Sequence, residues 1–167
     1  MKQLKTLLLA SACILTVSFT QAQSKIAHIN TNDLISAMPE MKAAQTELET
    51  FSKTLQTELQ SLGTELQNKS KQYTAEAPTK TQEENDKRQQ ELMTMEQNAR
   101  EFQNTAQKQY QEKQETLLKP ITEKARVAIL KVGRAQGFDY VLDSSVGVTI
   151  VADGKDLLND VKKELGI

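Results

Sequence analysis

Two long stripes of apolar residues run through the middle of the chain, one on each side of Pro78. Within each stripe the apolar positions are three or four residues apart except for one gap of seven, and nearly every residue between them is polar. The first stripe comprises Met41, Ala44, Leu48, Phe51, Leu55, Leu59, Leu62, Leu66 and Tyr73, and the second Leu92, Met95, Ala99, Phe102, Ala106, Tyr110, Leu117, Ile121, Ala125, Ala128, Val132 and Ala135. A narrow stripe of this kind is typical of a helix that packs against one neighbour only. The pattern therefore predicts a long antiparallel helical hairpin that projects into solvent.

Sequence signals mark the start of the first helix and the turn into the second. Pro39 suits the first turn of a helix, where its missing N–H has no partner to lose. At the far end the chain turns, and Thr81 with Glu84 three residues later forms the pattern of a capping box. We therefore expect a hairpin over residues 40–119, with its tip near residues 77–81.

The second helix is predicted to run to Gly137, a residue that commonly ends helices. Pro120 lies inside it, cannot donate a hydrogen bond to the carbonyl of Thr116, and should kink the helix. Because the first arm begins only near residue 40, residues beyond Pro120 need other partners. Residues 23–39 and 120–167 are therefore predicted to form a separate body from which the hairpin extends.

The two ends of the chain outside the hairpin are rich in β-forming residues. We expect short strands at Lys25–Asn30, Phe138–Asp143 and Val146–Val151, with the last two paired as a hairpin around Ser144 and Ser145. Three strands of this length cannot bury a stable core alone, and their edges would be open and apolar. The body is therefore predicted to pair with other subunits in an obligate oligomer, whose size this pattern does not fix.

A last short helix is expected after Asp156, which is placed to cap it. Its apolar residues would share one face and pack on the body; they are Leu157, Leu158, Val161 and Leu165. The fold class is thus mainly α with a small β body.

The first 22 residues have the features of a secretory signal peptide. Lys2 and Lys5 precede an apolar run that ends at Phe19, and a small-residue cleavage site follows at Ala22. The alternative is a lipoprotein signal that uses Cys13. Both interpretations place the mature chain outside the cytoplasm, and the first places it in the periplasm as a free protein.

Loss of this leader would remove two lysines and the single cysteine, so the formal charge would change from −1 to −3. A chain without cysteine has no disulfide and no thiolate metal site. A protein without a basic excess is a poor candidate for binding nucleic acid. The mature chain has no second long apolar run, so we do not expect it to be embedded in a membrane.

Candidate catalytic groups are few. His28 is the only histidine and has no nucleophile beside it, so a structural role is favoured. Asp139 and Asp143 are conceivable metal ligands, but the four-residue spacing between them spans a strand and a turn, which puts the two side chains on no common face. The six glycines are isolated and form no phosphate-binding loop. We therefore predict no enzyme activity, no metal and no cofactor.

The order of these parts resembles the Skp/OmpH family of periplasmic chaperones. The matching pieces are the leader, the segment KIAHINTNDLISAMP, a polar helical hairpin, and the stretch AILKVGRAQGFDYVLDSSVGVTIVADGKDLLNDVKKEL. The most specific part lies between Gly137 and Leu165. The resemblance covers the whole mature chain, but it is weak in the hairpin, where many coiled coils would match.

The resemblance implies a homotrimer in which three chains share a small β-barrel body. Three helical hairpins would hang from the body as tentacles and hold unfolded outer-membrane proteins without ATP. The residues implied to fill the shared body are Ile26, Ile29, Val141, Leu142, Val146, Val148 and Ile150. Candidate client contacts lie on or near the apolar stripes, and only Met93 falls off the stripe; they are Tyr73, Met93, Met95 and Phe102.

The charge of the hairpin departs from the basic tentacles of the best-known family members. Residues 40–119 contain 11 Lys and Arg against 14 Asp and Glu, a net charge of −3. Electrostatic capture of acidic clients or lipopolysaccharide is therefore not expected. We expect weak apolar contacts to dominate instead, with only a small loss of client binding at high salt.

Two other functions fit a hairpin of this kind. A structural spacer of the cell envelope would show longer uninterrupted heptads and would need no hollow oligomer. A periplasmic adaptor of the efflux type would need more strands on both sides of the hairpin than this chain provides.

Overall fold

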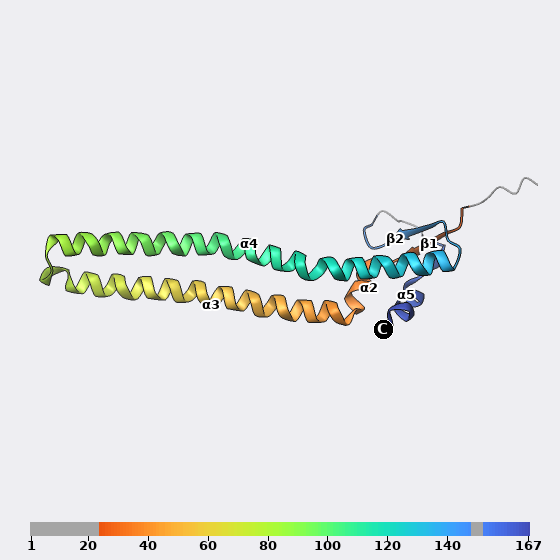
Figure 1. The fold of residues 1–167 in the computed structure, drawn as a ribbon, viewed down its shortest axis with the longest axis horizontal. Coiled ribbons are helices and arrows are strands. Elements are labelled where there is room, and N and C mark those ends of the chain that lie inside the picture. The colour runs from red at the N-terminus through yellow and green to blue at the C-terminus, as the bar shows by residue number, and fades with distance from the viewer. Residues whose placement is uncertain (1–23, 148–151) are drawn as a thin grey trace, which may run out of the picture.

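The computed structural model describes residues 24–147 and 152–167, which form a long two-helix hairpin and a small body at one end of it (Figure 1). The predicted fold class, mainly helical with a small β part, is confirmed for this chain. Sharing of the body between subunits stays a prediction. The predicted signal peptide lies outside the described residues.

The hairpin consists of α3 (Pro39–Glu76, 38 residues) and α4 (Gln82–Ala135, 54 residues). A single 3-10 turn, η1 (Ala77–Thr79), joins them. Pro39 stands in the first turn of α3, and the turn between the two helices lies at η1. At the rise of an α-helix, α3 is about 57 Å long.

Helix α4 passes through Pro120 without interruption, although its axis is not straight in Figure 1. The packing of α4 changes at this point. Before it, α4 runs beside α3; beyond it, α4 packs mainly on the body. The α4 residues buried in the body are Ile121, Ala125, Ala128, Val132 and Gly133.

The body contains a three-stranded sheet of order β2-β1-β3, formed by β1 (Ile26–Ile29), β2 (Tyr140–Asp143) and β3 (Lys155–Asp156). Both outer strands run parallel to β1. The predicted strand at 146–151 is wrong at its start, because Val146 lies in an exposed turn. Residues 148–151 lie outside the described part of the chain.

The parallel arrangement follows from the route of the chain. Parallel strands require a long crossover connection, and the entire hairpin serves as the crossover between β1 and β2. Gly137, with φ +71°, ends α4 and turns the chain back toward β1. Asp139 N–H then donates to the carbonyl of Lys25 at 2.8 Å, which begins the pairing.

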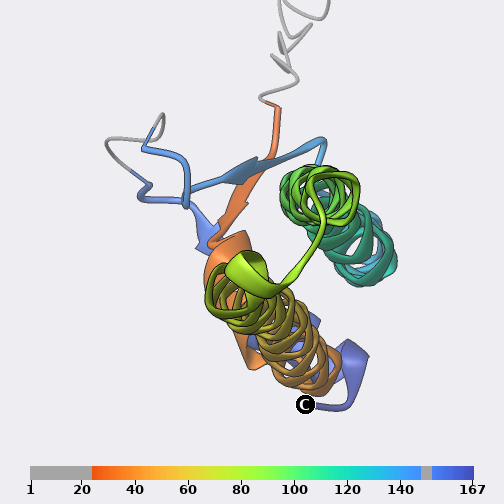
Figure 2. The same ribbon diagram turned by 90° about the vertical axis from the view of Figure 1, so that its left-hand side faces the viewer.

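Two short helices, α2 (Thr31–Ala37) and α5 (Leu158–Leu165), complete the body. In the view along the hairpin, the strands lie above and α5 below (Figure 2). The core between these elements includes five large, fully buried side chains: Ile29, Leu34, Met38, Leu157 and Val161. Asp156 Oδ1 accepts a hydrogen bond from Leu158 N–H at 2.8 Å and so caps α5 from one residue before its N-cap.

Candidate functional site

The apolar seam between α3 and α4 is only half-buried along the length of the arms. Within the described residues, no side chain is buried between Leu48 on α3 and Ile121 on α4. Two helices alone cover each other on one side only, so both flanks of the seam stay open. The hairpin therefore offers a long, discontinuous apolar surface to other molecules.

The four candidate client contacts differ from one another in how exposed they are. Met93 is 55 % exposed and points away from the seam, whereas Met95 and Phe102 are half-buried within it. Tyr73 is half-buried and engaged in contacts of its own chain near the tip. Contact of these residues with a client stays a prediction.

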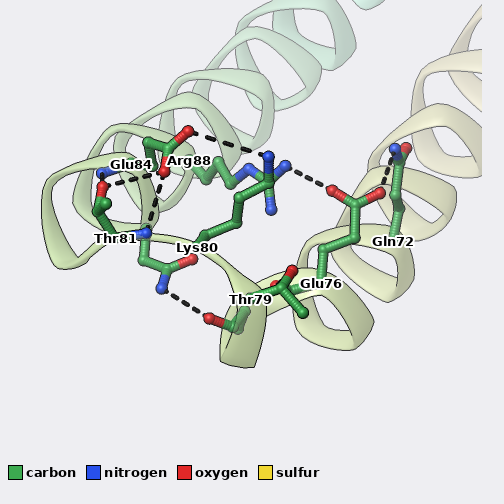
Figure 3. Close-up of polar contacts among 9 residues, drawn as sticks. Gln72, Glu76, Thr79, Lys80, Thr81, Glu84 and Arg88 are labelled. Atoms are coloured by element: carbon green, nitrogen blue, oxygen red, sulfur yellow. Dashed lines mark hydrogen bonds and ion pairs between the residues drawn. The ribbon is translucent and has the colours of Figure 1, made fainter.

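A polar network holds the two helices together at the tip (Figure 3). Arg88 Nη2 donates to Glu76 Oε2 at 2.5 Å, and the Arg88 guanidinium carbon lies 4.6 Å from the centre of the Tyr73 ring. Gln72 Nε2 donates to the other oxygen of Glu76 at 2.9 Å. This cluster was not predicted, because its members come from two helices whose register the sequence leaves open.

The turn itself is closed by local hydrogen bonds that Figure 3 also shows. Thr81 Oγ1 accepts from Glu84 N–H at 3.2 Å, and Glu84 Oε2 accepts from Thr81 N–H at 3.0 Å. The predicted capping box is thus confirmed. Asn85 Nδ2 also donates to the carbonyl of Ala77 at 3.1 Å, which ties the start of α4 to η1.

The contacts at the tip shift the pKa values of its acidic groups. Hydrogen bonds from Lys69 and then Tyr73 lower the pKa of Glu91. Those from Gln72 and Arg88 lower that of Glu76. The hydrogen bond that Tyr73 donates to Glu91, at 2.5 Å, raises the pKa of the phenol. All three groups therefore keep their ordinary charge at neutral pH.

A second set of contacts fastens the arms at the base of the hairpin. Lys113 Nζ lies 2.5 Å from Glu47 Oε1, and Lys124 pairs with Glu40. Beside these ion pairs, a hollow of about 310 Å³ lies between α3 and α4, with Pro120 on its wall. The arms are thus joined by charged pairs at the base and at the tip.

The outer face of the sheet is a second apolar surface. Tyr140 and Leu142 of β2 are 59 % and 44 % exposed, and Ile26 lies opposite Tyr140 in the register. The intervening residues Ala27 and Ile29 point inward and are buried. Tyr140 was not among the predicted oligomerisation residues, although its alternation with Val141 could have indicated it.

The predicted oligomerisation residues divide into three groups. Ile29 and Val141 pack inside this chain, against the core and α4 respectively. Ile26, Leu142 and Val146 are exposed, Val146 by 65 %. The remaining two, Val148 and Ile150, lie outside the described residues. Among the five that the structure describes, the exposed group is the one available to a second subunit, and its contact with one stays a prediction.

Asp139 and Asp143 fasten the ends of the sheet. Asp139 Oδ2 accepts from Lys25 N–H at 2.8 Å, and Asp143 Oδ2 from Thr31 Oγ1 at 2.7 Å. Burial raises the pKa of Asp143, but the hydrogen bonds from Thr31 and Ser145 outweigh it, and the net shift is downward. No group of acidic, histidine or cysteine residues in the described ranges could hold a metal ion.

His28 lies on the outer face of the sheet, opposite Leu142 in the register. It is half-buried, and its Nδ1 atom is buried without a hydrogen-bond partner. No helix in the described part of the chain has the length and apolar character needed to span a membrane.

Comparison with known proteins gives a consistent result. A family profile described as outer membrane protein (OmpH-like) matches residues 25–165. No curated protein matches the chain significantly. A crystal structure of a candidate OmpH-like outer membrane chaperone from Caulobacter crescentus CB15 has a TM-score of 0.75 and 19 % sequence identity, and the match covers 85 % of this chain and 83 % of that one.

Proposed function

This chain belongs to the OmpH-like outer membrane protein family, and from that premise we propose that it is an ATP-independent periplasmic holdase chaperone. It would bind unfolded outer-membrane proteins between its helical hairpins and prevent their aggregation. The observation that carries the proposal is the half-buried seam of α3 and α4, which offers weak apolar contacts over the length of the hairpin.

A holdase must bind many sequences and release them without an energy source. Many weak contacts on a mostly polar surface suit this task, because none of them fixes the conformation of the client and each can break alone. The seam has these properties, since its apolar side chains are half-exposed and separated by polar residues. Met93 adds a flexible, adaptable side chain outside it.

The outer face of the sheet supports the proposed homotrimer. Ile26, Tyr140 and Leu142 form an exposed apolar group on a sheet of only three short strands. Packing this face against other copies would cover it and would set the hairpins side by side around a cavity. The number three comes from the resemblance to the family.

The proposed location is the periplasm, which follows from the predicted leader at residues 1–22. The proposed partners are unfolded outer-membrane proteins and further copies of this chain. We propose no role for nucleic acid, metal or cofactor.

Light scattering behind a sizing column tests the proposal directly. Residues 23–167 are measured alone and after dilution of a urea-unfolded outer-membrane barrel into the sample. We expect a trimer that gains the mass of one client and keeps it in solution. A monomer or elongated dimer that leaves the client to aggregate would contradict the proposal.

The structural spacer and the efflux-type adaptor stay as alternatives. A spacer would not bind unfolded clients, so the same experiment separates it from a chaperone. The described part of the chain contains one sheet of three short strands, which gives the adaptor no support.

A further inference from the structure

The two arms are joined by charged contacts at both ends but not in between. On the body side the last such pair is Glu47 with Lys113, and on the tip side the first is Lys69 with Glu91. No hydrogen bond or ion pair between described residues crosses from α3 to α4 in the stretch between them. There, side-chain polar contacts stay within one helix, as with Lys53 and Glu49.

This stretch contains what we call the middle seam. Its members are Leu55, Leu59, Leu62 and Leu66 of α3 and Leu92, Met95, Ala99 and Phe102 of α4. Every one of these side chains is half-buried. Because only apolar contacts hold the arms here, the two helices can move apart locally while the pairs at base and tip keep the hairpin intact.

The middle seam also has an unfilled space at Gly63, which carries no side chain. A side-chain carbon added at Gly63 would meet no atom within 4 Å. Around this glycine lies a surface hollow of about 460 Å³ that Leu66 and Leu92 line from the two helices. The hollow is large enough to admit one or two apolar side chains of another molecule.

We propose that the middle seam is the client-binding surface of the hairpin, and that an extended segment of an unfolded β-barrel chain lies along it with an apolar side chain in the hollow at Gly63. This proposal rests on the proposed holdase function and adds the place of binding. The surface lies between the two helices of one hairpin rather than on their polar outer faces.

An extended, alternating client fits this surface better than a folded partner. Alternate residues of a strand are about 6.7 Å apart, and neighbouring seam positions, three or four residues apart in a helix, are separated by about 4.5 to 6 Å. The two repeats are similar in size but unequal, so they drift out of phase within a few steps. Apolar side chains of the client can therefore find successive seam residues without locking into one register, as a holdase requires.

A folded partner or a second copy is disfavoured by the same geometry. Stable docking of a folded surface needs a contiguous apolar patch of several hundred square ångströms. The middle seam is narrow, and exposed polar residues such as Gln67 and Glu96 border the hollow.

Two substitutions at Gly63 give a matched test. Gly63→Gln fills the hollow with a polar chain that covers Leu66 and Leu92, whereas Gly63→Ala leaves most of it open; both favour the helix. With a urea-unfolded eight-stranded outer-membrane barrel as the client, we expect Gly63→Gln to weaken binding about tenfold. Gly63→Ala should bind like the unsubstituted protein. Circular dichroism and light scattering check that both variants keep their helices and oligomeric state.

A second measurement reports the place of contact. Residues 23–167 contain no cysteine, so an environment-sensitive dye can be attached to Gly63→Cys or, as control, to the neighbouring Thr64→Cys, whose side chain lines the polar groove on α3. We expect the client to shift dye emission to the blue at position 63 and to leave position 64 nearly unchanged.

The outcomes separate the two proposals. If the unsubstituted protein binds the client but Gly63→Gln binds it equally well and both dyes respond alike, the middle seam is not the binding surface and the holdase function stands. If the unsubstituted protein does not bind the client, both proposals fail.

Discussion

Gly133 of α4 and Val141 of β2 are in direct contact: a Cβ atom added at Gly133 would lie 2.9 Å from Val141 Cγ2. This approach is closer than side-chain carbons normally allow. It sets how near the sheet can come to α4, and so it shapes the inner face of the body. An alanine at position 133 would therefore have to displace the Val141 side chain.

The contact predicts opposite effects for the same substitution at two helical glycines. Gly63→Ala should stabilise the chain, because alanine is favoured over glycine in a helix by about 1 kcal/mol and the site is open. Gly133→Ala gains the same propensity but must displace Val141, at a cost of about 1 to 3 kcal/mol for an overpacked core. Urea unfolding of both variants should find Gly133→Ala the less stable of the two.

The difference in unfolding free energy between these two variants isolates the cost of crowding Val141, because the gain in helix propensity is common to both. Gly133→Ala combined with Val141→Ala serves as the control and should recover part of the loss. Equal stability of the two single variants would show that β2 can shift away from α4 without cost.

Arg88→Gln tests the network at the tip. It removes both the pair with Glu76 and the cation stacked on Tyr73. We expect faster amide hydrogen exchange around the tip and no change around Ile121 in the body, because the two regions share no contacts. Lys53→Gln, which breaks an exposed pair within α3, is the matched control and should leave exchange at the tip unchanged.

Features set by neighbouring residues could be predicted from the sequence, whereas features that join residues far apart in the chain could not. The helix bounds were predictable, because Pro39, Thr81 and Gly137 act on their own neighbours. The parallel pairing of β1 with β2 was not, since local spacing suggested a hairpin between two adjacent apolar runs. The strand that β2 actually pairs with is more than a hundred residues earlier in the sequence.

The same limit applies to the candidate site. The stripes on both arms were predictable, because a periodic pattern reports which face of a helix is apolar. The gap at Gly63 and the pairing of Arg88 with Glu76 depend on the register of α3 against α4. A seam of similar leucines leaves that register open, so only the structure places these residues together.

Acid should loosen the tip of the hairpin. The pKa values of Glu76 and Glu91 are lowered from their ordinary value of 4.5, so their contribution to stability is present above pH 4.5 and is lost as the pH falls through the lowered values. Amide exchange near the tip should therefore accelerate below pH 4.5, after correction for the intrinsic rate. Hydrogen bonds with Thr81 lower the pKa of Glu84 as well. The triple variant Glu76→Gln/Glu84→Gln/Glu91→Gln should therefore lose most of this dependence, and an unchanged dependence would assign it to other groups.

Leu142→Asp tests the outer face of the sheet. A charge at the centre of a buried apolar interface is strongly unfavourable unless it is paired, so the proposed trimer should dissociate. Leu142 is 44 % exposed within one chain, so the substitution should leave the helix content nearly unchanged. Met93→Asp on the hairpin is the control and should keep the oligomer intact. Light scattering with circular dichroism separates the two effects, and a trimer that survives Leu142→Asp would place the subunit interface elsewhere.

Salt should have little effect on client binding. The net charge of −3 over residues 40–119 gives no strong field to attract a charged client. Exposed ion pairs within α3 and within α4 also place opposite charges side by side. At about 0.5 M salt the screening length is only about 4 Å, so electrostatic capture would be largely abolished. Apolar contacts along the middle seam would persist or strengthen slightly. We therefore expect the dissociation constant for an unfolded barrel to increase less than about threefold between low salt and about 0.5 M. Association that depends on electrostatic steering can instead slow by orders of magnitude over such a range.

A charge-reversed hairpin supplies the comparison for this measurement. Glu58→Lys with Glu65→Lys and Glu101→Lys would raise the net charge of residues 40–119 from −3 to +3, and none of the three is part of an ion pair among the described residues. This variant should bind an acidic client more tightly at low salt and lose that gain as salt rises. The unsubstituted protein should show neither change. A steep loss of binding in the unsubstituted protein would instead mean that local charges, such as Lys71 beside the hollow, dominate capture despite the acidic total.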